Sequence, residues 1–532
     1  MSKHADDENT HKDGAKFIRR AKNAFNNQNV DKHEIRDIYK FAMPNRNDFE
    51  SEDDRMVGVY DSTAINATAR FANRMQSELT PPFQSWFVIK AGSVFTDDDQ
   101  RLEMNKQLEI VSQTAMAALT SGGFTTASHE VYQDLAAGQG AMLILKTGQD
   151  DFPIRYISIP ASQVATEEGA WGQQVGLFWK RKIPANQLKG FWPDAKFSKS
   201  LEKLVGGDAS EKSTKLSIFM AFTKDGDIWS YDVIVEKDNE VIFSQEFNYK
   251  PFVAPRWSKM SGETRGRGPL HLALPDIKTI NKVKELLLMN AALAIVGAYT
   301  VLDDGVLNAD NLQIVPGALI PVASNGSGFS GPSILPLQTS RSFDITQLLI
   351  EDLKVSIKKM MLDDNLPPEL GAVRSPTEIV ARAKELAVDS GAAFGRLLDE
   401  WIVPVIQTTV DILADLGVFK TTFKLDNLVF KIQVLSSLAR VQDLADIEAV
   451  TQYVAVGGQL FGQEAVMVAT KLEELLPWIA ERMAVPAKFI RDKDEREIFS
   501  DQLAAQKAAQ SGLLDASNQN EPPQTQNGVL AA

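Results

Sequence analysis

The chain of 532 residues contains no cysteine and only five histidines. The missing thiols exclude a disulfide framework, a thiolate-bound zinc or iron–sulfur site and a cysteine nucleophile, and they suit a reducing compartment. No two histidines stand at the spacing of a metal-binding motif such as HExxH. We therefore expect no metal centre and no cofactor.

The sequence also lacks the phosphate-binding loop GxxxxGK[ST] and the nucleophile elbow GxSxG. The nearest approach to the phosphate loop, Gly207 to Thr214, has no second glycine and places Glu211 where a phosphate would bind. The acidic run Asp97 to Asp99 is interpreted as the start of a helix, where negative charge is favourable, and a cation site is the less favoured alternative. These patterns favour a structural or scaffold protein over an enzyme.

Signals for secretion and for the membrane are weak. The charged N-terminus, MSKHADDENTHKDG, has no apolar stretch of the kind that a signal peptide requires. One apolar run, Leu286 to Leu302, is 17 residues long and is closed by Lys284, Glu285, Asp303 and Asp304. Because a spanning helix needs about 20 residues, membrane insertion is the alternative, and packing against protein, including copies of the same chain, is favoured.

Length and charge limit the remaining classes. A chain of this length predicts three or four domains or one large elongated subunit, and 44% hydrophobic residues are enough for a folded core. The net charge of −14, from 56 basic and 70 acidic residues, argues against a broad basic surface that wraps nucleic acid. A short basic run, Lys16 to Lys22, is interpreted as a solvated helix face, with phosphate contact as the alternative.

Periodicity along the chain predicts a mixed α+β protein that is mainly helical. A mostly antiparallel β region is expected between residues 141 and 257, with hairpin turns at Asp225-Gly226-Asp227 and Lys237-Asp238-Asn239. A helix that begins at Pro376 should be kinked by Pro404. Helices are predicted at 15–43, 61–79, 100–137, 270–302, 344–362 and 376–416, and further ones at 438–457, 462–483 and 486–506, after a strand at 428–434.

Two connections differ in composition from the helices around them. The segment 303–342 holds five glycines and four prolines, and a structureless loop of that length is improbable, so it predicts a small subdomain with functional contacts. The segment 363–374, DDNLPPELGAVR, is an acidic link stiffened by proline. The tail 506–532 lacks aromatic residues, and we expect it to be disordered.

Several strings in the sequence match one protein family. The run GRGPLHLALPDIKTINKVKELLL from Gly266 to Leu288 follows Arg256-Trp257 and Ser261-Gly262-Glu263. The other strings are Tyr60-Asp61-Ser62-Thr63, Leu79-Thr80-Pro81-Pro82 with Trp86-Phe87, and Thr377-Glu378-Ile379 with Arg382 and Glu385. In this order and spacing, from about residue 30 to residue 500, the chain resembles the portal, or head-to-tail connector, proteins of short-tailed double-stranded DNA phages.

The resemblance implies a ring, usually of twelve subunits, at one vertex of the capsid, through which DNA is packaged and ejected. The expected place is therefore the virion, with assembly in the host cytoplasm, and no enzymatic activity and no stable membrane insertion are expected. The partners it implies are double-stranded DNA, the terminase large subunit, the major capsid and scaffolding proteins and the tail adaptor protein. Alternatives are a membrane-inserted channel or DNA-ejection protein, motivated by the apolar run, and a nucleotide-dependent translocase, against which the missing phosphate loop argues.

The same resemblance divides the chain into the parts of the portal fold. The segment 303–343 would be the clip, which meets the terminase and later the tail adaptor. The other expected parts are the wing (1–267 and 376–435), the stem helices (268–302 and 344–362), the tunnel loop (363–375), the crown (436–505) and the disordered tail (506–532).

The candidate functional residues follow from these parts. A negatively charged ring would repel phosphates and let DNA slide, so the few cations near the channel are of interest. Those cations are Lys354, Lys358, Lys359 and Arg374, for which ion pairs with Glu351, Asp352, Asp363 or Asp364 are an equally weighted alternative. The tunnel-loop candidates are Asn365, Pro367, Pro368 and Gly371, and the clip docking candidates are Asn325, Gly326, Ser327, Gly328 and Phe329.

Overall fold

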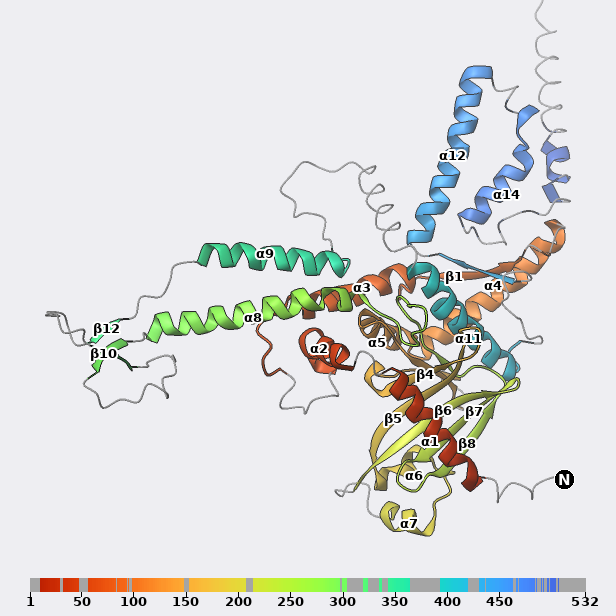
Figure 1. The fold of residues 1–532 in the computed structure, drawn as a ribbon. Coiled ribbons are helices and arrows are strands. Elements are labelled where there is room, and N and C mark those ends of the chain that lie inside the picture. The colour runs from red at the N-terminus through yellow and green to blue at the C-terminus, as the bar shows by residue number, and fades with distance from the viewer. Residues whose placement is uncertain are drawn as a thin grey trace, which may run out of the picture. The chain divides into compact units, whose positions relative to one another are not determined.

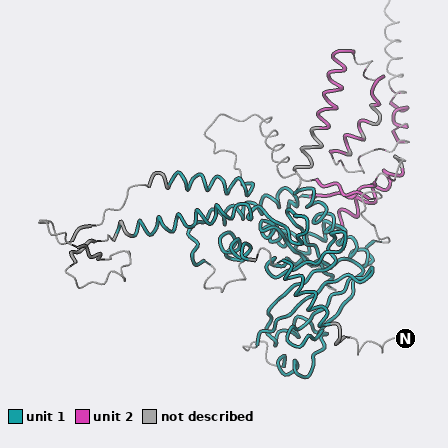
Figure 2. Tube along the Cα trace, viewed as in Figure 1, with its two compact units in different colours: residues 1–84, 115–422 teal, residues 85–114, 423–532 magenta. Residues whose placement is uncertain are grey.

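A computed structural model shows the fold of the chain (Figure 1). It describes residues 10–28, 32–46, 56–82, 84–92, 94, 98–147, 153–206, 214–296, 299–303, 319–323, 334–336, 343–363, 393–419, 430–435, 437–462, 466, 468–483 and short stretches between 485 and 506. The chain forms two compact units, one of residues 1–84 with 115–422 and one of residues 85–114 with 423–532 (Figure 2).

The first unit begins with helices. Where the sequence predicts one helix over residues 15–43, the structure has α1 (Thr10–Asn27) and α2 (Lys32–Ala42). Helix α3 (Thr63–Leu79) ends directly before Thr80-Pro81-Pro82, because proline has no backbone donor and disfavours helical geometry in the preceding residue. The predicted helix at 100–137 is divided into α4 (Asp98–Ser121), whose residues 98–114 belong to the second unit, and α5 (Phe124–Ala136) by Gly123, whose φ is 81°.

The β region at residues 141–257 is antiparallel, as the sequence predicts. Its larger sheet has the order β4-β5-β6-β7-β8, and its smaller sheet has the order β3-β2-β9. The predicted hairpin at Asp225-Gly226-Asp227 joins β6 to β7, with Gly226 at a φ of 61°. The strands are β2 (Met142–Lys146), β3 (Ile154–Ser158), β4 (Val164–Glu168), β5 (Gln174–Pro184), β6 (Lys215–Asp225), β7 (Ile228–Val235), β8 (Glu240–Phe247) and β9 (Phe252–Val253).

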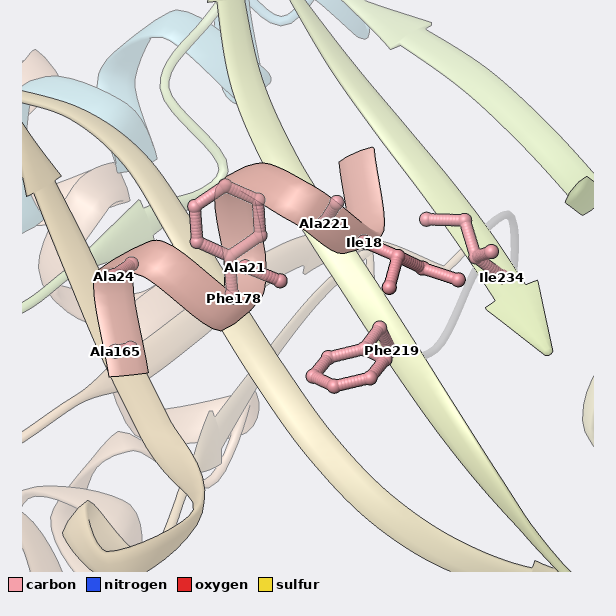
Figure 3. Close-up of a cluster of buried hydrophobic side chains, with 8 residues drawn as sticks. All are labelled: Ile18, Ala21, Ala24, Ala165, Phe178, Phe219, Ala221 and Ile234. Atoms are coloured by element: carbon pink, nitrogen blue, oxygen red, sulfur yellow. The ribbon is translucent and has the colours of Figure 1, made fainter. Parts of the chain in front are cut away.

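Helix α1 packs across one face of the larger sheet (Figure 3). Its buried side chains Ile18, Ala21 and Ala24 meet Ala165, Phe178, Phe219, Ala221 and Ile234 of the strands. Ion pairs flank this contact: Arg20 Nη2 lies 2.8 Å from Glu167 Oε2, and Lys22 Nζ lies 3.2 Å from Glu236 Oε1. Two cations of the run predicted to be solvated therefore bind the sheet, whereas Lys16 and Arg19 are exposed.

Two long helices follow the β region. Helix α8 (Pro269–Val296) and helix α9 (Phe343–Met360) pack against each other. Between them a three-stranded sheet has the order β11-β10-β12, with β10 (Tyr299–Asp303) parallel to β11 (Leu319–Ala323) and antiparallel to β12 (Ile334–Pro336). The small 3-10 and α-helices of the β region are η4 (Ala161–Gln163), η5 (Ala185–Gln187), α6 (Leu188–Phe191) and α7 (Lys199–Val205).

The helix predicted to continue to Leu302 therefore ends at Val296. Residues 299–303 form strand β10 instead. Tyr299, Thr300 and Val301 are aromatic or β-branched and favour extended backbone, and two later strands supply their hydrogen-bond partners. The 17-residue apolar helix that motivates a membrane channel is thus not formed. No helix in the described ranges is long and apolar enough to cross a membrane.

The second unit contains a two-stranded sheet and helices. Strand β1 (Phe87–Ala91) pairs antiparallel with β13 (Phe430–Val434), which agrees with the predicted strand at 428–434. The other edge of β1 is capped by α4, because Ile89 N donates to Ser112 Oγ at 2.9 Å and Ala91 N donates to Asn105 Oδ1 at 2.8 Å. Helices α12 (Ser437–Phe461) and α14 (Leu472–Arg482) follow. The tail 507–532 lies outside the described residues.

Candidate functional site: the α8–α9 hairpin and its root

The α8–α9 hairpin exposes large apolar side chains along both helices. In an ordinary soluble helix pair such side chains would face the core, and isolated exposed ones would be unremarkable. Here seven of them lie on α9 and on the second half of α8, with exposed fractions from 46% to 84%: Leu286, Leu288, Met289, Ile295, Leu348, Leu349 and Val355. We call these seven residues the hairpin apolar face.

The three predicted channel lysines lie on α9. Lys354 Nζ is 2.7 Å from Glu351 Oε1, and this hydrogen bond lowers the pKa of Glu351. The ion-pair alternative therefore holds for Lys354. Lys358 and Lys359 are exposed, and neither has an ion-pair partner among the residues that the structure describes.

The remaining predicted site residues lie outside the described residues. This concerns Arg374, the tunnel-loop residues Asn365, Pro367, Pro368 and Gly371, and the clip residues Asn325, Gly326, Ser327, Gly328 and Phe329. Their roles stay predictions.

The middle of α8 is held by a buried amide. Asn281 Oδ1 accepts the backbone N–H groups of Tyr60 at 2.7 Å and Asp61 at 3.2 Å, and its Nδ2 donates to Gly58 O at 2.8 Å. One turn further along α8, Lys284 forms an ion pair with Asp61. Burial alone would raise the pKa of Asp61, but hydrogen bonds from Lys284 and Thr63 outweigh it and lower the pKa. The string Tyr60-Asp61-Ser62-Thr63 thus attaches the start of α3 to α8.

Glycines allow the chain to pass close to itself at the root of α8. A Cβ on Gly138 would lie 2.1 Å from the carbonyl oxygen of Gly266, and a Cβ on Gly268 would lie 2.1 Å from that of Ala136. Gly138 also has a φ of 108°, which L side chains rarely adopt. The string GRG at residues 266–268 is therefore required for the contact between the end of α5 and the start of α8.

Arg256 joins three segments beside this contact. Its Nε donates to Glu400 Oε2 at 2.9 Å and its Nη2 to Glu400 Oε1 at 2.7 Å, while Nη1 pairs with Glu168. Lys259 Nζ reaches the same Glu168 at 2.6 Å. Burial would lower the pKa of Arg256, but the two carboxylates outweigh it and raise the pKa, so the guanidinium remains charged.

Glu400 lies in a π-helix, η7 (Leu398–Ile402), that leads into α11 (Val403–Asp415). The sequence predicts a kink at Pro404. The structure has a π turn directly before this proline, in which Val403 N donates to Leu398 O. Because Pro404 has no N–H, it could not complete an α-helical bond to Glu400, and the wider turn adapts the helix to that missing donor. The start of the helix predicted from Pro376 lies outside the described residues.

The C-terminal end of α9 is fixed by α3. Asp363 N donates to Lys358 O at 2.8 Å and Leu362 N to Lys359 O at 3.1 Å, which is the Schellman pattern. Leu362 occupies the left-handed position with a φ of 56°, where glycine is usual. Arg74 of α3 donates to Leu362 O, and Arg70 lies 3.2 Å from Asp363. The sequence predicts a helix over 344–362, and α9 ends two residues earlier, at Met360. The left-handed Leu362 was not predicted, since no glycine marks that position.

The described residues contain no cluster of histidine, aspartate or glutamate that could hold a metal ion. The hairpin has exposed apolar side chains, polar contacts from α8 to the segment before α3, and a close backbone approach to the end of α5 at its root. Residues 15–490 match the family model described as bacteriophage head to tail connecting protein.

The chain belongs to this family. Over 450 residues it is 22% identical to the "Probable portal protein" of Bordetella phage BPP-1. The matched region covers 80% of this chain and 77% of that protein. Two solved structures of gene transfer agent particles, a native virion and the neck of an empty particle, are similar with a TM-score of 0.32 each. Their sequence identities are 11% and 12%, and they cover 75% of this chain and 87% and 89% of theirs.

The family membership confirms the resemblance seen in the sequence. In this connector protein three of the strings on which the resemblance rests lie at the root of the hairpin. Tyr60-Asp61 binds Asn281 and Lys284, Arg256 binds Glu400, and the glycines of the GRG string meet Gly138 and Ala136. These three strings thus contribute residues that hold α8 and its neighbouring segments in place.

Proposed function

We propose that this connector protein is the portal of a phage capsid: a ring whose subunits surround a channel for double-stranded DNA. Family membership and the relative named as a portal protein support this role. By the same proposal the ring is the platform on which terminase, capsid, scaffolding and tail adaptor proteins dock. Such a protein acts by assembly and conduction, without a catalytic site.

The hairpin apolar face is the observation that carries the ring. Fully burying a leucine, isoleucine, valine or methionine side chain gains about 1.5–3 kcal/mol relative to leaving it exposed. Seven side chains that are 46% to 84% exposed on two packed helices would therefore favour association by several kcal/mol, on the order of 1 kcal/mol each. In a ring, the hairpins of neighbouring subunits would cover this face.

The assignments within the ring are proposals of the same kind. We assign α8 and α9 to the stem, β10 to β12 with their connections to the clip, residues 363–375 to the tunnel loop, and α12 and α14 to the crown. Lys358 and Lys359, which are exposed and without ion-pair partners in the described ranges, are the better candidates for facing DNA. Lys354 is the weaker one, because Glu351 neutralises it.

The direct test is microscopy of the purified full chain. Negative-stain images and mass photometry should show annuli with a central hole. Substituting Leu288→Glu together with Leu348→Glu should leave monomers, because it places charge in the proposed contact. Ile228→Glu, at an exposed residue of β7, is the matched control and should leave rings intact. A wild-type chain that remains a monodisperse monomer under all assembly conditions would contradict the proposal.

Two deletion variants test the proposed parts. Deleting residues 323–331 should leave rings intact and impair docking of the terminase or the tail adaptor, whereas loss of rings would show that the segment is architectural. Shortening residues 365–372 should spare assembly and damage packaging or retention of DNA. Unchanged genome length and unchanged retention would contradict the tunnel-loop role.

A further inference from the structure

Part of strand β5 has an open edge. Strand β4 pairs with β5 from Gln174 to Trp179, whereas β6 continues to pair with it as far as Pro184. Residues 180–183 therefore have a neighbouring strand on one side only. In the described part of the chain, none of their backbone groups forms a hydrogen bond outside the ladder with β6. Because alternate residues of a strand direct their N–H and C=O groups away from a given neighbour, this edge leaves main-chain donors and acceptors unused.

The two outer strands of the same sheet each have a hydrogen-bond partner outside the sheet. The amide of Gln28 lies against β4: with its O and N atoms exchanged, it donates to Val164 O at 3.1 Å and accepts from Thr166 N at 3.3 Å. On β8, Ile242 O accepts the N–H of Lys196 at 2.9 Å. Each outer strand thus has a partner along part of its edge, whereas Arg181 and Lys182 of the stretch 180–183 are exposed.

Cations gather at this open stretch. Lys180, Arg181 and Lys182 belong to it, Lys215 is directly opposite Pro184 on β6, and Lys189 follows on α6. Lys180 shares Glu236 with Lys22 at 3.1 Å. Among the described residues, Arg181, Lys182, Lys189 and Lys215 have no carboxylate within ion-pair distance, although the chain as a whole carries a net charge of −14. We call residues 180–183 with Lys189 and Lys215 the β5 edge.

Lysines on an open strand edge would be explained by their usual effect, which is to prevent that edge from pairing with the edge of another sheet. Arg181 does not fit that explanation. Its guanidinium lies 5.6 Å from the ring centre of Trp179 and 5.5 Å from that of Phe191, so two aromatic rings hold it. A guanidinium held in this way is prepared to bind a carboxylate through two parallel hydrogen bonds.

We propose that the β5 edge binds an extended acidic segment of a partner protein by strand addition. The partner's main chain would bond to residues 180–183, and consecutive acidic side chains would meet Lys180, Arg181 and Lys182 on alternate faces. A run of three acidic residues within an extended segment is therefore the fitting chemistry. The unused main-chain groups favour a polypeptide over DNA, since a duplex has no strand edge to pair with them. This proposal does not depend on ring formation.

The test uses the full-length protein and a fluorescein-labelled peptide of sequence VTVEEEVTV. We expect saturable binding by fluorescence anisotropy that weakens with salt, and slower hydrogen exchange of residues 179–184 when the peptide is present. The double substitution Arg181→Glu with Lys182→Glu should weaken binding by at least about tenfold, because it replaces attraction by repulsion. The matched control Lys224→Glu changes the charge of an exposed residue at the far end of β6 and should alter binding by less than about twofold.

A second peptide makes the test independent of any variant. Methylating alternate backbone nitrogens of VTVEEEVTV keeps its charge and removes its main-chain donors, so binding should fall by at least about tenfold. A short DNA duplex of equal charge should compete poorly. If the methylated peptide binds as well and DNA competes equally, the edge is a general anion surface and strand addition is wrong. Absence of binding by the unmodified peptide would overturn the proposal altogether.

Discussion

The substitution Arg256→Ala should cause a large loss of stability. The Arg256 side chain is only 5% exposed and pairs with Glu168 and Glu400, whose side chains are 16% and 21% exposed. Removing the guanidinium leaves two carboxylates without their main partner in a region that water reaches poorly. Lys259 remains close to Glu168, and Arg396 Nη1 remains 3.8 Å from Glu400 Oε1, so each carboxylate keeps one weaker partner.

The expected magnitude follows from this geometry. Breaking a buried ion pair by removing one partner costs about 3–5 kcal/mol, most of it from the uncompensated charge. Because both carboxylates are partly exposed, we expect the lower end, about 3 kcal/mol. The double substitution Arg256→Met with Glu400→Met removes both charges and should cost less than the sum of the two single substitutions. The coupling free energy should be about 1–3 kcal/mol.

Urea unfolding followed by tryptophan fluorescence and far-UV circular dichroism measures these differences, at one protein concentration so that assembly contributes equally. Arg256→Lys is the control, because it keeps the charge and loses the planar fork that spans both oxygens of Glu400. It should recover part of the lost stability. Two results would refute the argument that the ion pairs of Arg256 stabilise this region. One is additive changes in the free energy of unfolding in the double-substitution cycle, and the other is an Arg256→Ala variant whose free energy of unfolding is within about 0.5 kcal/mol of the wild type.

Four further predictions concern single positions. Gly266→Ala should lower the free energy of unfolding, measured with urea, by at least about 2 kcal/mol, because its Cβ would lie 2.3 Å from Gly138 O. The control Gly190→Ala should be neutral or stabilising, because a Cβ there would have no atom within 4 Å. Asn281→Ala should lower the free energy of unfolding by about 2 kcal/mol and speed hydrogen exchange at residues 58–61. Unchanged exchange would contradict the role of the Asn281 amide in holding this segment against α8. Leu362→Gly should be more stable than Leu362→Ala by about 1 kcal/mol, because only glycine lacks the Cβ that strains a φ of 56°. Burial lowers the pKa of Lys250 from 10.5 to about 8, so between these pH values the unfolded chain binds more protons than the folded chain. The contribution of Lys250 to the free energy of unfolding therefore rises with pH across that window. The variant Lys250→Met should be more stable than the wild type at pH 7 and should lack this rise.

Local patterns in the sequence determined much of the secondary structure. The proline pair after Thr80 ended α3 where expected, and turn residues at Asp225-Gly226-Asp227 placed a hairpin between β6 and β7. The spacing of Glu351 and Lys354 on one helix already allowed their ion pair. These features depend on interactions between residues close in sequence, so one sequence is enough to predict them.

Other features needed partners from distant parts of the chain. The apolar run after Leu286 favours a helix by itself, but its end became β10 because β11 and β12 supply hydrogen bonds there. Strand β1 was not expected, since its partner β13 lies in a far segment. In each case a non-local pairing outweighed the local preference.

The sequence by itself determined the family, because the order of its short strings is specific. The tertiary structure alone decided what those strings do: glycines at 266 and 268 admit a close approach, Arg256 reaches Glu400, and Asn281 binds the segment before α3. It also decided that a neutral-looking residue, Leu362, takes the left-handed position at the end of α9, where Arg74 holds it. The physical reason is that burial, backbone approach and strain are properties of several segments brought together, and no single segment contains them.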